Sequence, residues 1–241
     1  MHTETSSTSA VQAAGRASAQ AGAPAVPQAA TIVREYGPFD GATNIHGVSF
    51  DGHKVWAATG DRLIAIDPAS GATTRSIERP GDAGTAFDGT YLYQIAEERI
   101  DKIDPADGKV VHTIPAPGHG SDSGMAWAEG SLWVGQYRER KIHQIDPADG
   151  RIIRSIESNR FVTGVTWVDG ELWHGTWEGD DSAIRRIDPA SGAVLAQLDM
   201  PAGTGVSGLE SNGSDLFYCG GGGSGKVRAV LRPVLRPVRA G

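Results

Sequence analysis

A short turn motif recurs five times in this chain, at intervals of roughly 40 residues. Each copy places an acidic or amide residue and a Gly after a short apolar strand, and an aromatic residue closes the copy six positions after its first residue. The copies begin at Phe50, Phe87, Trp127, Trp167 and Ser211, and three positions before them stand Gly47, Gly84, Gly124, Gly164 and Gly208. Self-similarity at a fixed period indicates a repeat protein.

A second turn follows the first four copies and has its own constant sequence. It runs from Ile66 to Gly71, Ile103 to Gly108, Ile145 to Gly150 and Ile187 to Gly192, and always contains Asp-Pro. The Pro presets φ, the Asp bonds the turn backbone and the Gly takes a positive φ, so each segment predicts strand, tight turn, strand. Each repeat therefore contains four antiparallel strands.

Four strands in about 40 residues are what one blade of a β-propeller requires. A parallel solenoid would have a shorter period, and a β-sandwich would not repeat its turn chemistry in every unit. The sequence therefore predicts an all-β fold, a five-bladed β-propeller with four antiparallel strands per blade.

The two ends of the repeat region predict how the ring closes. After Phe217 the chain supplies only one more strand, whereas residues 31 to 36 form an unpaired strand before the first copy. This N-terminal strand can complete the last blade, which leaves no open edge at the seam. We therefore expect a disordered tail over residues 1 to 30, the propeller over residues 31 to 231 and a basic, solvated tail over residues 232 to 241. The basic run at this end comprises Arg228, Arg232, Arg236 and Arg239.

Composition narrows the classes of partner. The net charge of -7 and the lack of clustered Lys and Arg in the blades argue against a nucleic-acid surface. No apolar segment predicts a secretory signal or a membrane span. A single cysteine, Cys219, excludes an internal disulfide framework. We therefore expect a cytoplasmic monomer without a cofactor or a metal, whose partner is a small molecule or a peptide.

One face of the propeller varies between blades and is the expected location of a site. It carries the links before the innermost strands and the links between the second and third strands. The first set brings Asn44, His46, Asp82, His119, Asp122, Ser123, Arg160, Thr163, Thr204 and Ser207. The second set brings Glu97, Glu98, Gln136, Tyr137, Arg138, Thr176, Trp177, Glu178 and Cys219, and His174 lies on the strand before Thr176. This mixture of groups around one axis suits a small polar ligand.

From these residues we select candidates for chemistry and for binding. The catalytic candidates are His46, Glu97 and Glu210. The ligand-binding candidates are Ser123, Gln136, Tyr137, Arg138, Arg160, Thr163, His174, Trp177, Ser207 and Cys219.

Several candidates also have a purely structural interpretation. Glu210 stands where the other blades have small residues, so it is either a functional carboxylate or the partner of a structural Arg. His46 is a proton acceptor, a metal ligand or a hydrogen-bonded structural residue. A metal site would need the fold to bring His46, His119 and His174 together with Glu97 or Cys219, which no spacing demands. Cys219 would act as a nucleophile only beside a base.

The tryptophans of the repeat have a structural interpretation too. Trp127, Trp133, Trp167 and Trp173 occupy repeat positions, so we expect them to pack between blades. Trp177 has no aromatic counterpart in another blade except Tyr137, and both are candidates to face a ligand.

The repeated hairpin with an Ile-Asp-Pro turn behind it resembles the plant and bacterial type of glutaminyl-peptide cyclotransferase, a five-bladed propeller. The resemblance is clearest from Val168 to Trp177 and at Ile187-Asp188-Pro189. Related repeats occur in virginiamycin B lyase, which has more blades. Enzymes of the cyclotransferase family convert an N-terminal Gln to pyroglutamate with the help of a carboxylate near the first blade. Ala57 stands where that family carries its Glu, His46 where it carries Gln, and Gly175 where it carries Asn.

Two functions are consistent with these observations. The first is a cyclotransferase-like propeller, an acyltransferase or lyase, that binds a small polar or peptidic ligand and acts on it. Proton transfer would then fall to His46, Glu97 or Glu210. The second is a non-catalytic propeller that docks a ligand or a protein on the same face. The fold alone does not choose between them.

Overall fold

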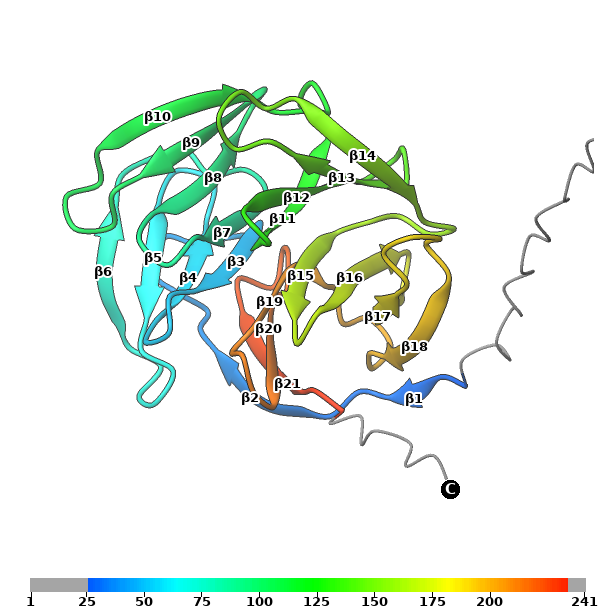
Figure 1. Cartoon of the computed structure of the whole chain (residues 1–241). Coiled ribbons are helices and arrows are strands. Elements are labelled where there is room, and N and C mark those ends of the chain that lie inside the picture. The colour runs from blue at the N-terminus through cyan, green and yellow to red at the C-terminus, as the bar shows by residue number, and fades with distance from the viewer. Residues whose placement is uncertain (1–25, 234–241) are drawn as a thin grey trace, which may run out of the picture.

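Five β-sheets are arranged in a ring around a central axis (Figure 1). The structure is a computed structural model, which describes residues 26–233. In four sheets the antiparallel strands follow one another in sequence order from the axis outward, and one of these sheets has an additional fifth strand. In the remaining sheet the outermost strand comes from the N-terminal end of the propeller. The fold is the predicted five-bladed β-propeller.

The repeats of the sequence correspond to the blades. Blade 1 contains β3 (Gly47–Phe50), β4 (Val55–Ala58), β5 (Leu63–Ile66) and β6 (Thr73–Ile77). Blade 2 contains β7 (Thr85–Phe87), β8 (Leu92–Ala96), β9 (Arg99–Ile103) and β10 (Val110–Pro115). Blade 3 contains β11 (Asp122–Ala128), β12 (Ser131–Gln136), β13 (Lys141–Ile145) and β14 (Ile152–Glu157). Blade 4 contains β15 (Gly164–Val168), β16 (Glu171–Glu178), β17 (Asp181–Ile187) and β18 (Val194–Asp199). Blade 5 contains β19 (Ser207–Ser211), β20 (Leu216–Gly220) and β21 (Val227–Leu231).

The missing strand of blade 5 comes from the N-terminal end of the propeller. Strand β2 (Ile32–Tyr36) pairs antiparallel with β21, with Tyr36 opposite Val227, which confirms the predicted closure by residues 31 to 36. A further strand, β1 (Gln28–Ala29), pairs parallel with β18, with Gln28 opposite Leu198. Strand β1 thus lies within residues 1 to 30, and the predicted domain boundaries stay predictions. The alternating pattern did not reveal β1 because two residues are too few to show a period.

The constant turn chemistry has the predicted cause. In each Asp-Pro turn the Asp carboxylate accepts a backbone N–H two residues on, as Asp104 Oδ1 does from Ala106 at 2.8 Å and Asp188 Oδ1 from Ala190 at 2.7 Å. The Gly that ends each turn has a positive φ, for example 81° at Gly71 and 78° at Gly150. The turns are therefore fixed by their own side chains, which explains why they recur in the first four blades.

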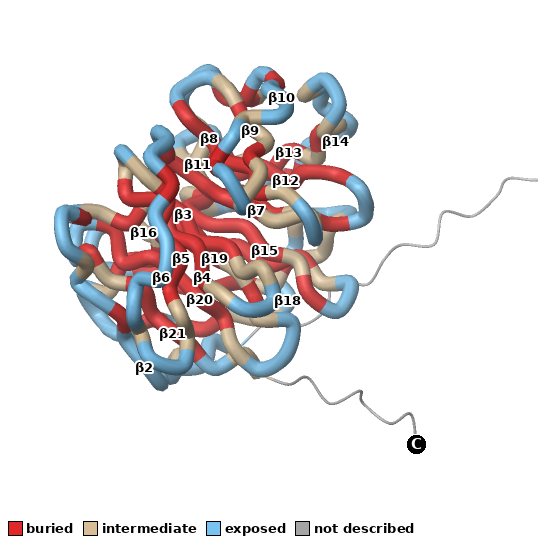
Figure 2. Tube along the Cα trace, turned by 90° about the vertical axis from the view of Figure 1, so that its left-hand side faces the viewer, coloured by how far each residue is buried: buried red, intermediate tan, exposed pale blue. Residues whose placement is uncertain are grey.

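The core lies between neighbouring blades. Aromatic residues of one blade pack on those of the next, with ring centroids 5.5 Å apart for Tyr93 and Trp127, and 5.2 Å apart for Trp133 and Trp167. Trp173 meets Phe217 in the same way at 5.0 Å. The predicted role of the repeat tryptophans in inter-blade packing is therefore confirmed. Burial is highest at the inner strands and lowest at the outer strands and turns (Figure 2).

The two ends of the chain differ in part from the prediction. Arg228 is only 7% exposed within β21, where its Nε donates to Glu35 Oε1 at 2.8 Å, so the interpretation of this residue as part of a solvated tail is wrong. The predicted tails at residues 1–25 and 234–241, with Arg236 and Arg239, lie outside the described residues. Within residues 26–233 no helix is long and apolar enough to span a bilayer. The cytoplasmic location and the monomeric state stay predictions.

Candidate functional site

Five glycines, one from the beginning of each blade, meet at the axis. A Cβ added to Gly84 would lie 2.5 Å from the backbone N of Met125, and one added to Gly164 would lie 2.6 Å from the carbonyl carbon of Gly208. The other contacts, from Gly47 to Gly84, Gly124 to Gly164 and Gly208 to Gly47, complete the circle. We call these five residues the glycine ring. Only residues without a side chain allow five backbones to approach so closely, which explains the Gly three positions before each turn motif.

A pocket of about 390 Å³ lies at the axis on one side of the glycine ring, and we call it the axial pocket. Its lining includes the residue immediately before each ring glycine: His46, Ala83, Ser123, Thr163 and Ser207. The remaining lining residues are Asn44, Ile45, Asp82, Asp122, Tyr137, Trp177, Gly222 and Gly223. The pocket therefore lies on the variable face, where six of the predicted site residues come together.

Asp122 is the carboxylate of the axial pocket with the most unusual environment. Its Oδ2 accepts the Gly118 N–H at 2.9 Å, whereas its Oδ1 is buried without a hydrogen-bond partner. Burial raises the pKa of Asp122 to about 6, against the opposing effects of the Gly118 N–H and the charge of His119. A carboxyl group with such a pKa can both hold and release a proton near neutral pH.

Two further titratable groups share the axial pocket with Asp122. The Asp82 carboxylate accepts the backbone N–H of Glu97 at 3.1 and 3.2 Å, which holds the Asp82 side chain in place. Burial lowers the pKa of His46, and the negative charge of Asp82 partly offsets this effect. A neutral imidazole and two carboxylates give the pocket an acidic character that favours a cationic ligand.

The aromatic residues of the pocket are held by their surroundings. Trp177 Nε1 donates to the Gly179 carbonyl oxygen at 2.9 Å, and its ring packs against Gly205 and Gly222 so closely that a Cβ on either glycine would lie 2.6 Å from it. The Tyr137 ring packs on Phe161 with centroids 4.6 Å apart. The pocket wall therefore includes an indole and a phenol ring of fixed position.

The residues immediately before the ring glycines form the floor of the axial pocket. Their hydroxyl groups fall into two kinds. Ser123 Oγ donates to backbone oxygens, with the Val162 oxygen at 2.6 Å, and Ser207 Oγ contacts the Ile45 oxygen at 2.5 Å and the Gly222 N–H at 2.8 Å. These two serines bind the blades to one another. Thr163 Oγ1 is buried and has no hydrogen-bond partner.

The predicted catalytic residues Glu210 and Glu97 do not line the axial pocket. Glu210 comes two positions after Gly208, on the other side of the glycine ring from His46. It accepts hydrogen bonds from Thr166 Oγ1 at 2.5 Å and from the Ser211 N–H at 2.8 Å, and burial raises its pKa to about 7. Glu97 is exposed and forms an ion pair with Arg99 at 3.0 Å. The interpretation of Glu210 as the partner of a structural Arg is wrong, because its partners are a hydroxyl and a backbone amide.

Five predicted ligand residues also lie outside the axial pocket. Gln136 is buried, with its Oε1 2.9 Å from His143 Nε2, and Arg138 is an exposed turn residue. His174 is fully buried, and burial lowers its pKa to about 4. Cys219 belongs to the core between blades 4 and 5, where burial raises the pKa of its thiol to about 12. Arg160 lines a different cleft.

Asp82 and Asp122 were expected on the variable face but were not among the predicted catalytic or ligand-binding residues. Both stand two positions before a ring glycine, where the other three blades carry the buried apolar residues Ile45, Val162 and Val206. This departure from the repeat was the signal that could have identified them. Among the described residues, no group of three or more His, Cys, Asp or Glu side chains is arranged to hold a metal ion.

Comparisons with known proteins agree with the propeller fold. A family model described as "Outer membrane protein assembly factor BamB" matches residues 96–232. No curated protein matches the chain at a significant level. The solved structure of Myxococcus xanthus glutaminyl cyclase superposes with a TM-score of 0.72 at 19% sequence identity, covering 88% of this chain and 100% of the other. The β-propeller domain of Cps50 (Swd1) from Myceliophteria thermophila superposes with a TM-score of 0.54 at 9% identity, covering 85% and 100%. At these identities the solved structures show the fold alone.

Proposed function

The chain belongs to the family described as outer membrane protein assembly factor BamB and has a glutaminyl cyclase-like fold, and from this premise we propose that its axial pocket binds the amino terminus of a small peptidic ligand and moves a proton there through Asp122. The observation that carries the proposal is the position of Asp122, whose Oδ1 is buried and unpartnered in a pocket that also contains Asp82 and His46.

The pocket suits a ligand with a primary amine. Asp82 and Asp122 attract an ammonium group, and the indole of Trp177 and the ring of Tyr137 provide apolar and cation–π contact beside it. A volume of about 390 Å³ lies within the range of small-molecule sites and accommodates the first residues of a peptide. The free hydroxyl of Thr163 offers a hydrogen bond to a ligand carbonyl.

The reaction that fits these groups is the cyclisation of an N-terminal Gln, which the name of the M. xanthus structure suggests. The α-amine nitrogen forms a bond to the side-chain amide carbon, and the bond from that carbon to the amide nitrogen breaks. Asp122 accepts the proton from the attacking amine and returns it to the leaving ammonia. Its pKa of about 6 allows both steps near neutral pH.

The test is a turnover assay that measures ammonia release from Gln-initiated peptides. We expect Asp122→Asn to lower kcat by about a hundredfold or more, the usual contribution of a general acid–base group. In the wild type, kcat/KM should fall as the pH drops through about 6, because Asp122 then becomes protonated. Glu97→Gln makes a comparable change at an exposed carboxylate outside the pocket and should keep the wild-type rate.

Peptide binding is measured in parallel by calorimetry, with an N-acetylated peptide as the competitor that lacks the amine. Ammonia release that is equal in wild type and Asp122→Asn would exclude Asp122 as the proton carrier. Equal affinity for the free and the acetylated peptide would exclude recognition of the amino terminus.

A non-catalytic propeller is the second candidate, and two observations favour it. Ala57 is fully buried on β4, at the position where the cyclotransferase resemblance expects the catalytic Glu. The family description also names an assembly factor rather than an enzyme. This function predicts saturable binding of Gln-initiated peptides without ammonia release at any pH.

A further inference from the structure

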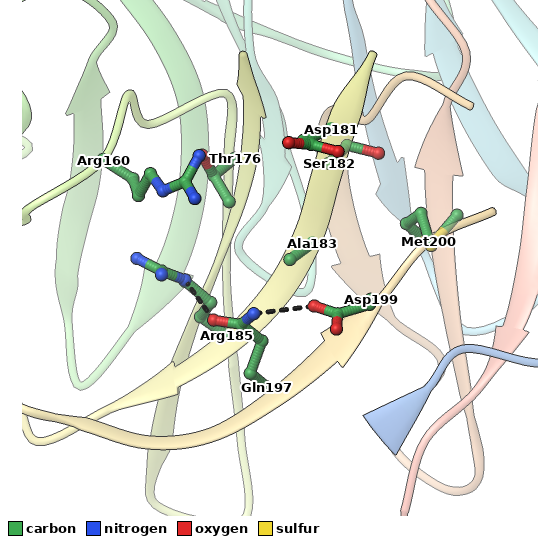
Figure 3. Close-up of a pocket in the computed structure, with 9 residues that line it drawn as sticks. All are labelled: Arg160, Thr176, Asp181, Ser182, Ala183, Arg185, Gln197, Asp199 and Met200. Atoms are coloured by element: carbon green, nitrogen blue, oxygen red, sulfur yellow. Dashed lines mark hydrogen bonds between the residues drawn. The ribbon is translucent and has the colours of Figure 1, made fainter. Parts of the chain in front are cut away.

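A second cleft, of about 290 Å³, lies on blade 4 away from the axial pocket (Figure 3). It is bounded by strands β16, β17 and β18 and by Arg160 from the link that precedes blade 4. Its polar lining includes Arg160, Thr176, Asp181, Arg185, Gln197 and Asp199, and we call it the blade 4 cleft. None of these residues lines the axial pocket.

Arg185 is a buried cation without a carboxylate partner. It is 7% exposed, its Nε donates to Gln197 Oε1 at 2.9 Å and its Nη1 donates to Asn159 Oδ1 at 2.7 Å. No ion pair found among residues 26–233 includes Arg185, whereas Arg160 Nη1 pairs with Glu178 Oε2 at 3.0 Å and presents only its remaining N–H groups to the cleft. Burial and the nearby charge of Arg160 lower the pKa of Arg185, and the charges of Glu178 and Asp199 partly offset this effect. Two amide oxygens leave several guanidinium N–H groups free, so the cleft has unused capacity for an anion.

Thr176 provides an independent sign of a ligand at the same place. Its side chain is 3% exposed, and its Oγ1 is buried without any hydrogen-bond partner. A buried polar group without a partner is costly, so such groups are rare in native proteins. In Figure 3 the guanidinium groups of Arg160 and Arg185 lie on the same side of the cleft as Thr176. A carboxylate held between these groups would satisfy the hydroxyl and the free N–H groups together.

The opposite side of the cleft is acidic. In Figure 3 Asp199 lies on the far side of Ala183 from the two arginines, and Asp181 lies beside Ser182 at the end of β17. The Gln197 side chain bridges the two sides, because its Oε1 accepts from Arg185 and its Nε2 donates to Asp199 Oδ1 at 2.6 Å. This arrangement fixes the positions of one cation and one anion on the wall of the cleft. The two carboxylates disfavour a ligand with several negative charges.

We propose that the blade 4 cleft binds a small zwitterion of the amino-acid type. Arg160, Arg185 and the Thr176 hydroxyl hold its carboxylate, and Asp181 and Asp199 hold its ammonium group. Ala183 lies between the two sides and contacts the aliphatic part of the ligand. The site is separate from the axial pocket, so the proposal does not depend on the function proposed for that pocket.

The test is a calorimetric titration of the full chain with a panel of free L-amino acids. The key variant is Thr176→Val, which keeps the side-chain shape and removes a hydroxyl that has no partner within the protein. We expect it to weaken binding by about tenfold, the effect of losing one hydrogen bond to a charged group. The variant without ligand should melt at the wild-type temperature or above it, because it loses an unsatisfied buried hydroxyl.

Two controls separate the cleft from the axial pocket. Thr163→Val makes the same change at the unpartnered hydroxyl of the axial pocket, and Asp122→Asn removes an axial carboxylate. Both should leave unchanged the component of amino-acid binding that Thr176→Val weakens. Amino-acid carboxamides and N-acetyl amino acids, which each lack one charge, should bind at least about tenfold more weakly than the free amino acid.

Three results would overturn the proposal. They are the absence of saturable binding of any free amino acid, equal affinity in Thr176→Val and wild type, and binding of inorganic phosphate as tight as that of the best amino acid.

Discussion

At the scale of single residues, burial determines which titratable side chains are available for chemistry. His174 and Cys219 are predicted ligand residues, but burial keeps the imidazole neutral, with a pKa of about 4, and the thiol protonated, with a pKa of about 12. Both therefore have a structural role. Glu210 is different, because burial raises its pKa to about 7 and its ionisation falls in the physiological range.

We expect Glu210 to make the stability of the propeller depend on pH. Its pKa in the folded state is raised from 4.5 to about 7, so between these values the native state binds more protons than the unfolded state. The free energy of unfolding therefore loses a contribution as the pH rises through this window. Gln in place of Glu210 mimics the protonated form, and its Oε1 can still accept from Thr166 and Ser211. The stability of Glu210→Gln relative to wild type should be higher at pH 8 than at pH 4.

Urea denaturation at a series of pH values measures this difference. Glu97→Gln removes a carboxylate at an exposed site and controls for the change in net charge. A constant difference in stability between Glu210→Gln and wild type from pH 4 to pH 8 would contradict the assigned burial of this carboxyl group.

Only part of the candidate site could be predicted from single positions in the sequence. His46, Ser123, Thr163 and Ser207 were identified because each precedes a ring glycine on the variable face. The pKa of Asp122 depends on how completely neighbouring segments cover it, which the local sequence does not contain. Glu210 lies on the other side of the glycine ring from His46, and a pattern along one strand does not tell where the ring lies.

At the scale of elements, the five innermost strands depend on the glycine ring. These strands carry the residues of the pocket floor on one side of the ring and the small residues Ser49, Ala86, Ala126 and Thr166 on the other. The strands and turns were predictable because every blade repeats them. Strand β1 was not, because it has no counterpart in other blades and pairs parallel to β18.

A side chain at the glycine ring should separate the blades. In Gly124→Ala the new Cβ would collide with the backbone of Gly164 and would lie 2.6 Å from Val165 N, and a backbone cannot move away as a flexible side chain can. We expect a loss of about 3 kcal/mol or more in the free energy of unfolding, the upper range for overpacking. Gly223→Ala is the control, since its Cβ would meet only the Asn44 side chain, at 3.4 Å. Thermal and urea unfolding of both variants would measure the effect, and equal stabilities would show that the ring tolerates side chains.

At the scale of the whole molecule, a repeated contact links each blade to the next around the circumference. A side chain on the outermost strand of one blade bonds a carbonyl in the Asp-Pro turn of the following blade. These contacts join Arg34 to Pro68 and Ala69, Arg75 to Ala106, His112 to Ala148, and Arg154 to Pro189. The junction from blade 4 to blade 5 differs, because β18 carries Ala196 at this position and blade 5 lacks the Asp-Pro turn. There Arg232 of blade 5 pairs with Asp169 of blade 4 instead, at 2.6 Å.

The strand that closes the ring participates in several of these interactions. Strand β2 supplies Arg34 to the circumferential contacts, and Glu35 to ion pairs with Lys226 and with the buried Arg228, at 2.7 and 2.8 Å. It also supplies Tyr36, which is buried in the core between blades 5 and 1. Strand β1, by contrast, consists of two exposed residues that extend the edge of blade 4.

We therefore expect two N-terminal truncations to differ sharply in stability. Removing residues 1 to 30 deletes β1 and should lower the melting temperature by only a few degrees. Removing residues 1 to 37 also deletes β2 and with it the buried side chain of Tyr36. The loss of a buried aromatic side chain lowers the free energy of unfolding by about 3 kcal/mol or more. In a chain of this size that corresponds to a fall in melting temperature of roughly 6 to 12 °C. Circular dichroism melts of the two proteins compare them directly.

A synthetic peptide spanning residues 26 to 37 should raise the melting temperature of the longer truncation, because it can pair with the exposed edge of β21. Two results would mean that the ring is stable without its N-terminal strand. They are equal melting temperatures of the two truncated proteins, or no change in the melting temperature of the longer truncation when the peptide is added.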